Sequence, residues 1–172
     1  MTMPEFSRIL DIRHLPAGQH VATADETERR RLAGRLGLSA IDTLTATLTL
    51  AADSDVIAVK GRIAAAIIQP CAISGEDFPV VVDEPVDLRF IPARTAIGEP
   101  DEEIEITADA CDEIEYTGLT FDLGEALAQT LALAIDPFAQ GPDADRARAE
   151  HGLSGEGAGG AFAALGALKP KD

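Results

Sequence analysis

The sequence contains no tryptophan, one tyrosine and six phenylalanines, so aromatic residues make up only 4% of its 172 residues. The hydrophobic content of 46% is still typical of a globular protein. We therefore expect a core built from alanine and branched aliphatic side chains. A chain of this length can bury enough surface to fold without disulfides or a structural metal ion.

Cysteine is also scarce. Cys71 and Cys111 are too few for a disulfide framework, and they do not form the Cys-x-x-Cys pairs that structural zinc sites use. The first residues lack the basic stretch followed by an apolar stretch that is typical of a secretory signal. The longest apolar runs, residues 63–68 and 131–135, are far shorter than a membrane-spanning helix. These features predict a cytoplasmic protein with no membrane partner.

Basic residues are few as well, with 14 Lys and Arg against 30 Asp and Glu and a net charge of −16. Affinity for nucleic acid comes largely from Lys and Arg that displace counterions, so this balance argues against a broad RNA-binding surface. The imbalance is local. Residues 1–62 are neutral, whereas residues 63–145 carry a net charge of −17 and no base lies between Arg94 and Arg146.

The densest part of this region is an acidic run over residues 99–115. Three interpretations are open: a solvated loop, a docking surface for a cationic partner, or a site for a hard cation such as Ca²⁺ or Mg²⁺. The run consists of Glu99, Asp101, Glu102, Glu103, Glu105, Asp109, Asp112, Glu113 and Glu115.

Motifs of known catalytic sites are missing. The sequence has no Gly-rich phosphate loop, no G-x-S-x-G and no H-E-x-x-H, and its three histidines are scattered. We therefore expect no enzymatic activity, no catalytic residues, no bound metal and no cofactor. The alternative from another class is a metal-dependent enzyme that uses the carboxylates of Asp109, Asp112, Glu113 and Glu115.

Alternating apolar and polar residues predict several strands. The clearest is residues 43–50, where leucine and alanine alternate with threonine, and longer strands are expected over residues 56–69 and 80–91. Shorter alternating segments at residues 6–14 and 113–116 complete the pattern. We expect an α+β protein with a curved antiparallel sheet of about five strands, barrel-like if it closes, covered by two main helices.

Two helices are predicted from their start signals. Thr23 with Glu26, and Asp122 with Glu125, have the spacing of capping boxes, and Gly37 is a suitable stop for the first helix. The second helix, over residues 122–135, is apolar around more than half of its girth and should be well buried. The first helix carries the one basic cluster of the sequence, formed by Arg29, Arg30, Arg31 and Arg35.

The C-terminal part changes in composition. Residues 139–160 are rich in Gly and Asp, which predicts a flexible linker after a single domain over residues 1–138. Residues 161–172 then place Phe162 and Leu165 at helical spacing. A short helical segment on such a linker packs either on its own domain or on a partner.

Four segments in this order resemble the YceD family, the large-ribosomal-RNA-subunit accumulation proteins of bacteria. They are residues 67–71 followed by 84–90, the acidic run ending at residues 112–116, the helix region 121–137 and the terminal segment 161–169. Many relatives have Cys-x-x-Cys at the first place, where this chain has Cys71 and Ser74.

The resemblance implies a non-enzymatic factor that promotes 23S rRNA synthesis or processing and accumulation of the large ribosomal subunit. The charge distribution favours a basic ribosomal or assembly protein as the partner of the acidic run, since opposite charges attract at long range. Direct rRNA binding through Arg29, Arg30, Arg31 and Arg35 is the alternative. The candidate partner-binding residues are these four arginines together with Asp112, Glu113, Glu115, Phe162 and Leu165.

Overall fold

Alternation of small apolar and polar residues builds the centre of the fold. Strands β3 (Ala40–Asp53) and β4 (Val56–Pro70) form a long antiparallel hairpin, and β5 (Asp77–Pro92) pairs with β4 along its whole length. Leu44 and Leu48 are buried and the threonines between them face away, as the alternation predicts. The tight turn between β3 and β4 includes Ser54 at a positive φ of 57°.

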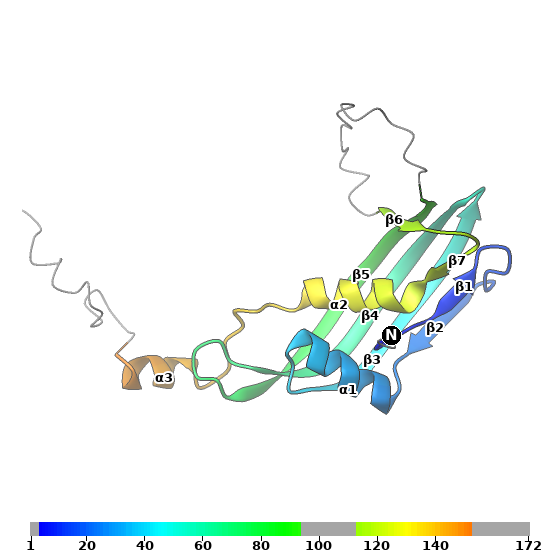
Figure 1. The fold of residues 1–172 in the computed structure, drawn as a ribbon. Coiled ribbons are helices and arrows are strands. Elements are labelled where there is room, and N and C mark those ends of the chain that lie inside the picture. The colour runs from blue at the N-terminus through cyan, green and yellow to red at the C-terminus, as the bar shows by residue number, and fades with distance from the viewer. Residues whose placement is uncertain (1–3, 94–112, 153–172) are drawn as a thin grey trace, which may run out of the picture.

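The computed structural model describes residues 4–93 and 113–152. Its main sheet has the strand order β2-β3-β4-β5-β6, with β2 at Gln19–Thr23 and β6 at Glu113–Tyr116. The two outermost strands do not pair with each other, so the curved sheet stays open and is not a barrel (Figure 1). The predicted α+β class with a five-stranded sheet is confirmed.

One pairing differs from the predicted antiparallel sheet. Strand β6 runs parallel to β5, with Glu113 opposite Arg89 and Tyr116 opposite Pro92. A parallel neighbour cannot follow a tight turn, because the chain must run back beside β5 before it can pair with it in the same direction. The segment between Pro92 and Glu113 is the connection between the two strands, and it contains most of the acidic run.

Helices α1 (Glu26–Leu36) and α2 (Leu123–Ala134) lie on the same face of the sheet (Figure 1). Helix α1 ends at Gly37, as predicted, in the left-handed conformation at φ 68°. Its predicted start is wrong: Asp25 and Glu28 form the capping box, because Thr23 is the last residue of β2 and pairs with Thr45.

A second, two-stranded sheet fastens the N-terminal segment to α2. Strand β1 (Ile9–Asp11) pairs with β7 (Thr120–Asp122), and Asp122 then caps α2 as predicted. The reciprocal bond of the predicted capping box is replaced: the Glu125 side chain accepts from Arg35 and not from the backbone of Asp122.

The core lies between the sheet and the two helices. Leu123, Leu127 and Leu131 of α2 are fully buried, and Phe90 packs against Phe121 with ring centroids 4.3 Å apart. Leu133 is 88% exposed, so the expectation that all of α2 would be well buried is wrong for its outer side. This helix lies near the rim of the sheet, and its apolar surface is wider than the part that the sheet covers.

The predicted linker is ordered at its beginning. Helix α3 (Ala144–Glu150) lies within the expected linker 139–160, and its Ala144 and Ala147 are buried. Gly141, just before it, packs against the ring of Phe78. The expectations for the rest of the linker and for the segment 161–172 fall outside the described residues. Among the helices that the structure describes, none has the length and apolarity needed to cross a membrane.

Candidate functional site

The four arginines of α1 lie close together in the structure, but most of them are occupied within the protein. Arg35 makes a two-pronged contact with Glu125 of α2, with N–O distances of 2.7 and 2.8 Å, and a third contact with Glu5 at 3.2 Å. This bidentate geometry is the strongest form of arginine–carboxylate contact. The hydrogen bond from Arg35 holds the pKa of Glu125 below its usual value.

Two further arginines have local partners. Arg30 contacts Glu26 one turn earlier on α1 at 2.8 Å, at the spacing of four residues that brings side chains together on a helix. Arg29 donates to the backbone carbonyls of Ala24 and Ile41, at 2.8 and 3.2 Å, and so ties α1 to β3. Arg31 is exposed, and within the described ranges it has no hydrogen bond or ion pair.

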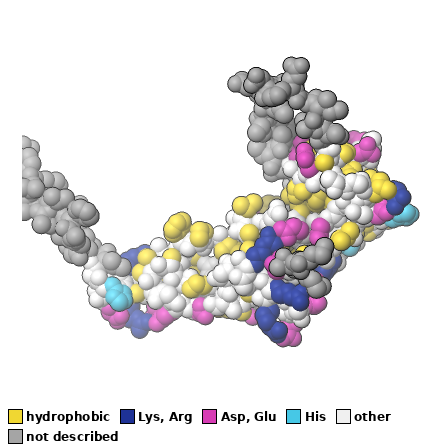
Figure 2. All heavy atoms as spheres, in the orientation of Figure 1, with side chains coloured by type: hydrophobic (Ala, Val, Ile, Leu, Met, Phe, Trp, Pro, Cys, Tyr) yellow, Lys and Arg dark blue, Asp and Glu magenta, His cyan; other side chains and the backbone are white. Residues whose placement is uncertain are grey.

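The same pattern extends over the described surface. Apart from Arg29 and Arg31, every lysine and arginine in residues 4–93 and 113–152 lies within 4 Å of a carboxylate. Figure 2 shows this on one face, where the dark blue side chains around α1 alternate with magenta ones. Most basic side chains of the described residues are therefore engaged within the protein, and they are too few to pair with all of the carboxylates described there.

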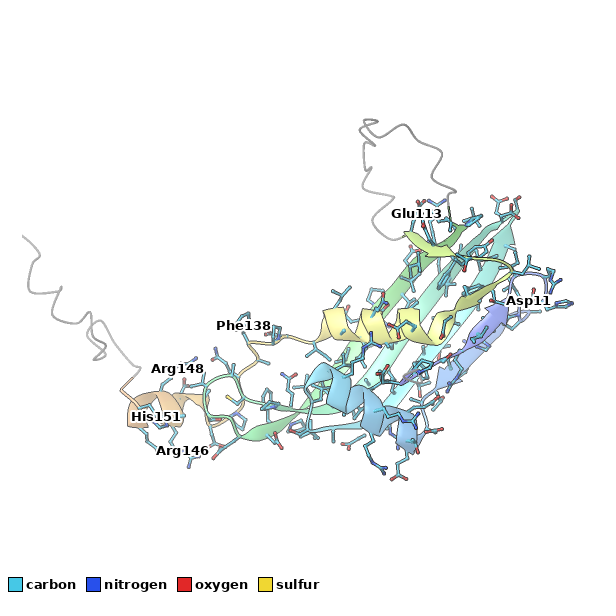
Figure 3. All side chains as sticks on the ribbon, in the orientation of Figure 1. Asp11, Glu113, Phe138, Arg146, Arg148 and His151 are labelled. Carbon is cyan, nitrogen blue, oxygen red and sulfur yellow. The ribbon has the colours of Figure 1, made fainter. Side chains whose placement is uncertain are left out.

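Two of the predicted acidic residues lie on β6, at the end of the sheet (Figure 3). Glu113 contacts Arg89 of the neighbouring strand at 3.4 Å, while Glu115 is exposed. Asp112, Phe162 and Leu165 lie outside the described residues, so their predicted roles have no structural counterpart here.

Glu115 borders a hollow of about 270 Å³ between β6, β7 and α2. Glu125 and Asp122 also line it, and the side chains of Phe90, Tyr116 and Phe121 lie beneath. Asp122 is held as the helix cap and Glu125 by Arg35, whereas the side chain of Glu115 has no hydrogen bond or ion pair with another described residue. A single lysine or arginine side chain suits such a site.

Metal-ligating residues do not gather in the described part of the chain. No group of three or more His, Cys, Asp or Glu side chains with a suitable arrangement is found there. Asp109 and Asp112 of the hypothetical metal site fall outside that part. The structure thus brings together only Glu113 and Glu115 of that set, on the same short strand.

Cys71 is buried in the tight turn after β4. The Ser74 side chain and backbone bond to its sulfur, and with the backbone N–H groups of Gly141 and Ile73 they lower the pKa of the thiol to about 7. Ser74 occupies the position that a second cysteine would take in a Cys-x-x-Cys pair. Here it acts as a hydrogen-bond donor that closes the turn.

Because the folded thiol ionises first, the unfolded chain holds more protons between about pH 7 and the ordinary thiol value of 9.0. We therefore expect the free energy of unfolding to rise with pH across this window. Urea unfolding of the protein and its Cys71→Ala variant should show the rise only in the former, and Cys111→Ala should retain it. An equal pH dependence in all three would contradict the ionisation of Cys71.

Two glutamates that hold Arg35 were not predicted from the sequence. Glu5 and Glu125 are far from α1 in the chain, and Arg35 binds both. The Asp122–Glu125 spacing marks Glu125 only as a helix cap. No local pattern marks either glutamate as a partner of Arg35, because both pairs join segments that are far apart in the chain.

Comparisons with family models, with curated proteins and with solved structures find no match to this chain.

Proposed function

We propose that this protein is a non-enzymatic cytoplasmic factor that promotes 23S rRNA maturation and accumulation of the large ribosomal subunit, and that its acidic surface binds a basic ribosomal or assembly protein. The role in ribosome biogenesis is inferred from the resemblance of its segments to the YceD family. The mode of action is inferred from the distribution of charge on the folded protein.

The observation that carries this mode of action is the internal pairing of the basic residues. Arg29, Arg30 and Arg35 are held by carbonyls or carboxylates, so most of the cluster cannot turn to RNA without losing contacts that stabilise the fold. The acidic run has no basic residue among its nine acids, and its last two acids, Glu113 and Glu115, lie on β6. A polycation is attracted to this charge and a polyanion is repelled.

A binding experiment with purified components tests this proposal. The full-length protein is titrated with basic large-subunit ribosomal proteins and, separately, with fragments of 23S rRNA. We expect the proteins to bind and their affinity to fall about tenfold as salt rises from low to physiological concentration, because exposed charges are screened. Replacing the five acids between residues 99 and 105 by their amides should weaken this binding.

The matched control is the double variant Arg30→Gln and Arg31→Gln, which should bind the ribosomal proteins as the unaltered chain does. If the unaltered chain binds rRNA and the double variant does not, the arginine alternative replaces the acidic-surface proposal. In cells, deletion of the gene should reduce free large subunits in sedimentation profiles and raise the level of 23S precursors. Unchanged profiles and precursors would refute the role in biogenesis.

A further inference from the structure

Strand β5 has an unpaired outer edge over most of its length. Strand β6 covers only the four residues from Arg89 to Pro92, and no other described strand pairs with β5 on that side. Exposed edges of this length are templates for pairing with another chain. Two prolines interrupt the edge, at Pro79 and Pro85, and they restrict where such pairing can occur.

The ladder shows which backbone groups point outward. The Ala66 N–H donates to the side-chain hydroxyl of Thr43 on β3, so the N–H of Ala66 points toward β3 and away from β5. In an antiparallel ladder the residue opposite then faces outward too, and Val81 is opposite Ala66. Because the direction of the backbone groups alternates along a strand, the N–H groups of Val81 and Asp83 point to solvent. Pro79 and Pro85 lie at the corresponding positions on either side, but proline has no N–H group. The usable edge is therefore residues 79–85.

A groove runs beside this edge, on the side where α2 lies. It consists of two hollows, of about 310 and 380 Å³, which meet at Glu84 and Ala134. Val80 and Val82 line the first hollow, and Val86 and Leu88 the second. Leu133 on α2 also lines the second, so the groove has apolar walls on both sides.

Exposed apolar side chains continue this surface beyond the groove. Leu133 is 88% exposed and Phe138, just after α2, is 77% exposed. Figure 3 shows Phe138 projecting away from the body of the protein, and Figure 2 shows hydrophobic side chains standing out along this side. Exposed aromatic and aliphatic side chains of this kind are typical of interaction surfaces.

The charge of the groove selects a cation. Glu84 lies where the two hollows meet, is exposed, and has no ion pair within the described ranges. The C-terminal end of α2 faces the same place, and its last turn contains no basic residue to balance the negative end of the helix dipole. Asp83 and Asp87 do not add to this, since Arg62 and Lys60 already pair with them on the other face.

We propose that residues 79–85 of β5, together with the groove between β5 and α2, bind an extended basic segment of a partner polypeptide that adds to the sheet as a strand. The N–H groups of Val81 and Asp83 hold its backbone. Its apolar side chains fill the two hollows, and a lysine or arginine reaches Glu84. This inference rests on the proposed function for the class of partner and names the surface that recognises it. A second copy of this chain is disfavoured, because Glu84 and the helix terminus would meet their own like charges.

The probe is a short synthetic peptide in which valines alternate with polar residues and a central arginine is on the valine side. Its binding to the full-length protein is measured by titration calorimetry, with a peptide of the same pattern and a central glutamate as control. We expect the arginine peptide to bind at least about tenfold more tightly. Equal binding, or none by the arginine peptide, overturns the proposal.

Two variants locate the site. Val81→Pro removes one outward N–H at a position where Pro79 and Pro85 show that proline fits the edge, and Val81→Thr is its control. Glu84→Arg reverses the charge in the groove, and Asp53→Arg makes the same change at the β3–β4 turn. We expect about tenfold weaker peptide binding in Val81→Pro and Glu84→Arg and no change in the controls. If Val81→Pro fails to fold, Glu84→Arg alone decides.

Hydrogen exchange distinguishes the possible occupants. In the full-length protein the amides of Val81 and Asp83 should exchange quickly and become protected when the peptide is added. If these amides exchange slowly and become fast when residues 153–172 are removed, the chain's own C-terminal segment occupies the edge. If they become fast on dilution, a second copy of the chain occupies it. Either result overturns the proposal.

The two proposals can fail separately. Ribosomal proteins that bind equally well to the unaltered chain and to Glu84→Arg would overturn the β5 site and leave the acidic-surface function standing. If the peptide binds in a way that requires Glu84 but the protein binds no ribosomal component, the proposed function in ribosome biogenesis is refuted and the β5 site remains.

Discussion

Replacing Gly61 by alanine is expected to lower the free energy of unfolding by about 3 kcal/mol, a loss typical of severe overpacking. Gly61 lies in the middle of β4, where a Cβ atom would stand 2.9 Å from the Cα of Leu48 and closer still to the carbonyl oxygen of Thr47. These are backbone atoms of the adjacent strand, so they move only if the β3–β4 ladder moves. Urea unfolding monitored by circular dichroism measures the change.

Gly34→Ala is the matched control. Gly34 lies in the exposed part of α1, and nothing lies within 4 Å of the Cβ position there. The same substitution should raise stability by up to about 1 kcal/mol, because alanine is the better helix former. The two variants are thus expected to change stability in opposite directions. A Gly61→Ala protein as stable as the unaltered chain would show that β3 and β4 are further apart than the structure indicates.

Replacing Asp122 by alanine is expected to cost about 3 kcal/mol, more than a helix cap alone contributes. Its carboxylate accepts from the backbone N–H groups of Gly124 and Glu125, at 2.9 and 3.2 Å, and so caps α2. It also accepts from the Ser7 hydroxyl at 2.6 Å and from the Arg8 N–H at 2.8 Å. The variant therefore loses a cap and the attachment of the N-terminal segment together.

Asp25→Ala separates these two effects. Asp25 caps α1 through the Glu28 N–H at 2.9 Å, and among the described residues its side chain bonds to no distant segment. Its loss should cost about 1 kcal/mol, the usual contribution of a cap. Thermal unfolding of both variants, with proteolysis to detect release of residues before β2, provides the comparison. If the two substitutions cost the same and release nothing, Asp122 is only a cap.

Regular alternation made the central strands predictable from the sequence. The leucines and threonines of residues 43–50 have a strict period of two, and the helices that the structure describes cover one face of the sheet, so the pattern corresponds directly to burial. Strand β2 shows no such pattern. Its five residues include one buried side chain, Ala22, and it forms because the edge of β3 is available to pair with it.

Signals that repeat within a few residues were harder to interpret. Thr23 and Asp25 both precede a glutamate at the capping distance, and sequence alone cannot rank them. The structure decides between them because Thr23 belongs to the β2–β3 ladder. Likewise, the alternation at residues 113–116 predicts a strand but says nothing about its direction, which depends on where the chain returns to the sheet.

The sequence identifies the charged residues of the candidate site but not the partners that they contact in the fold. Charge counting identifies the arginines of α1 and the acidic run. It does not reveal that Arg35 is occupied by Glu125, since that pair joins residues 90 positions apart. Pro85 is compatible with an edge or a bulge, since proline cannot donate within a sheet. The groove beside this edge could not be predicted, because it depends on where α2 crosses the sheet.

The attachment of the N-terminal segment also bears on the order of folding. The β3–β4 hairpin closes through a two-residue turn, whereas Ser7 and Asp122 are 115 positions apart. Contacts that close short loops form early because they cost little chain entropy, and those that close long loops form late. The β1–β7 pair should therefore be the last part of the fold to assemble and the first to open, which leaves the rest of the sheet intact when the N-terminal segment detaches.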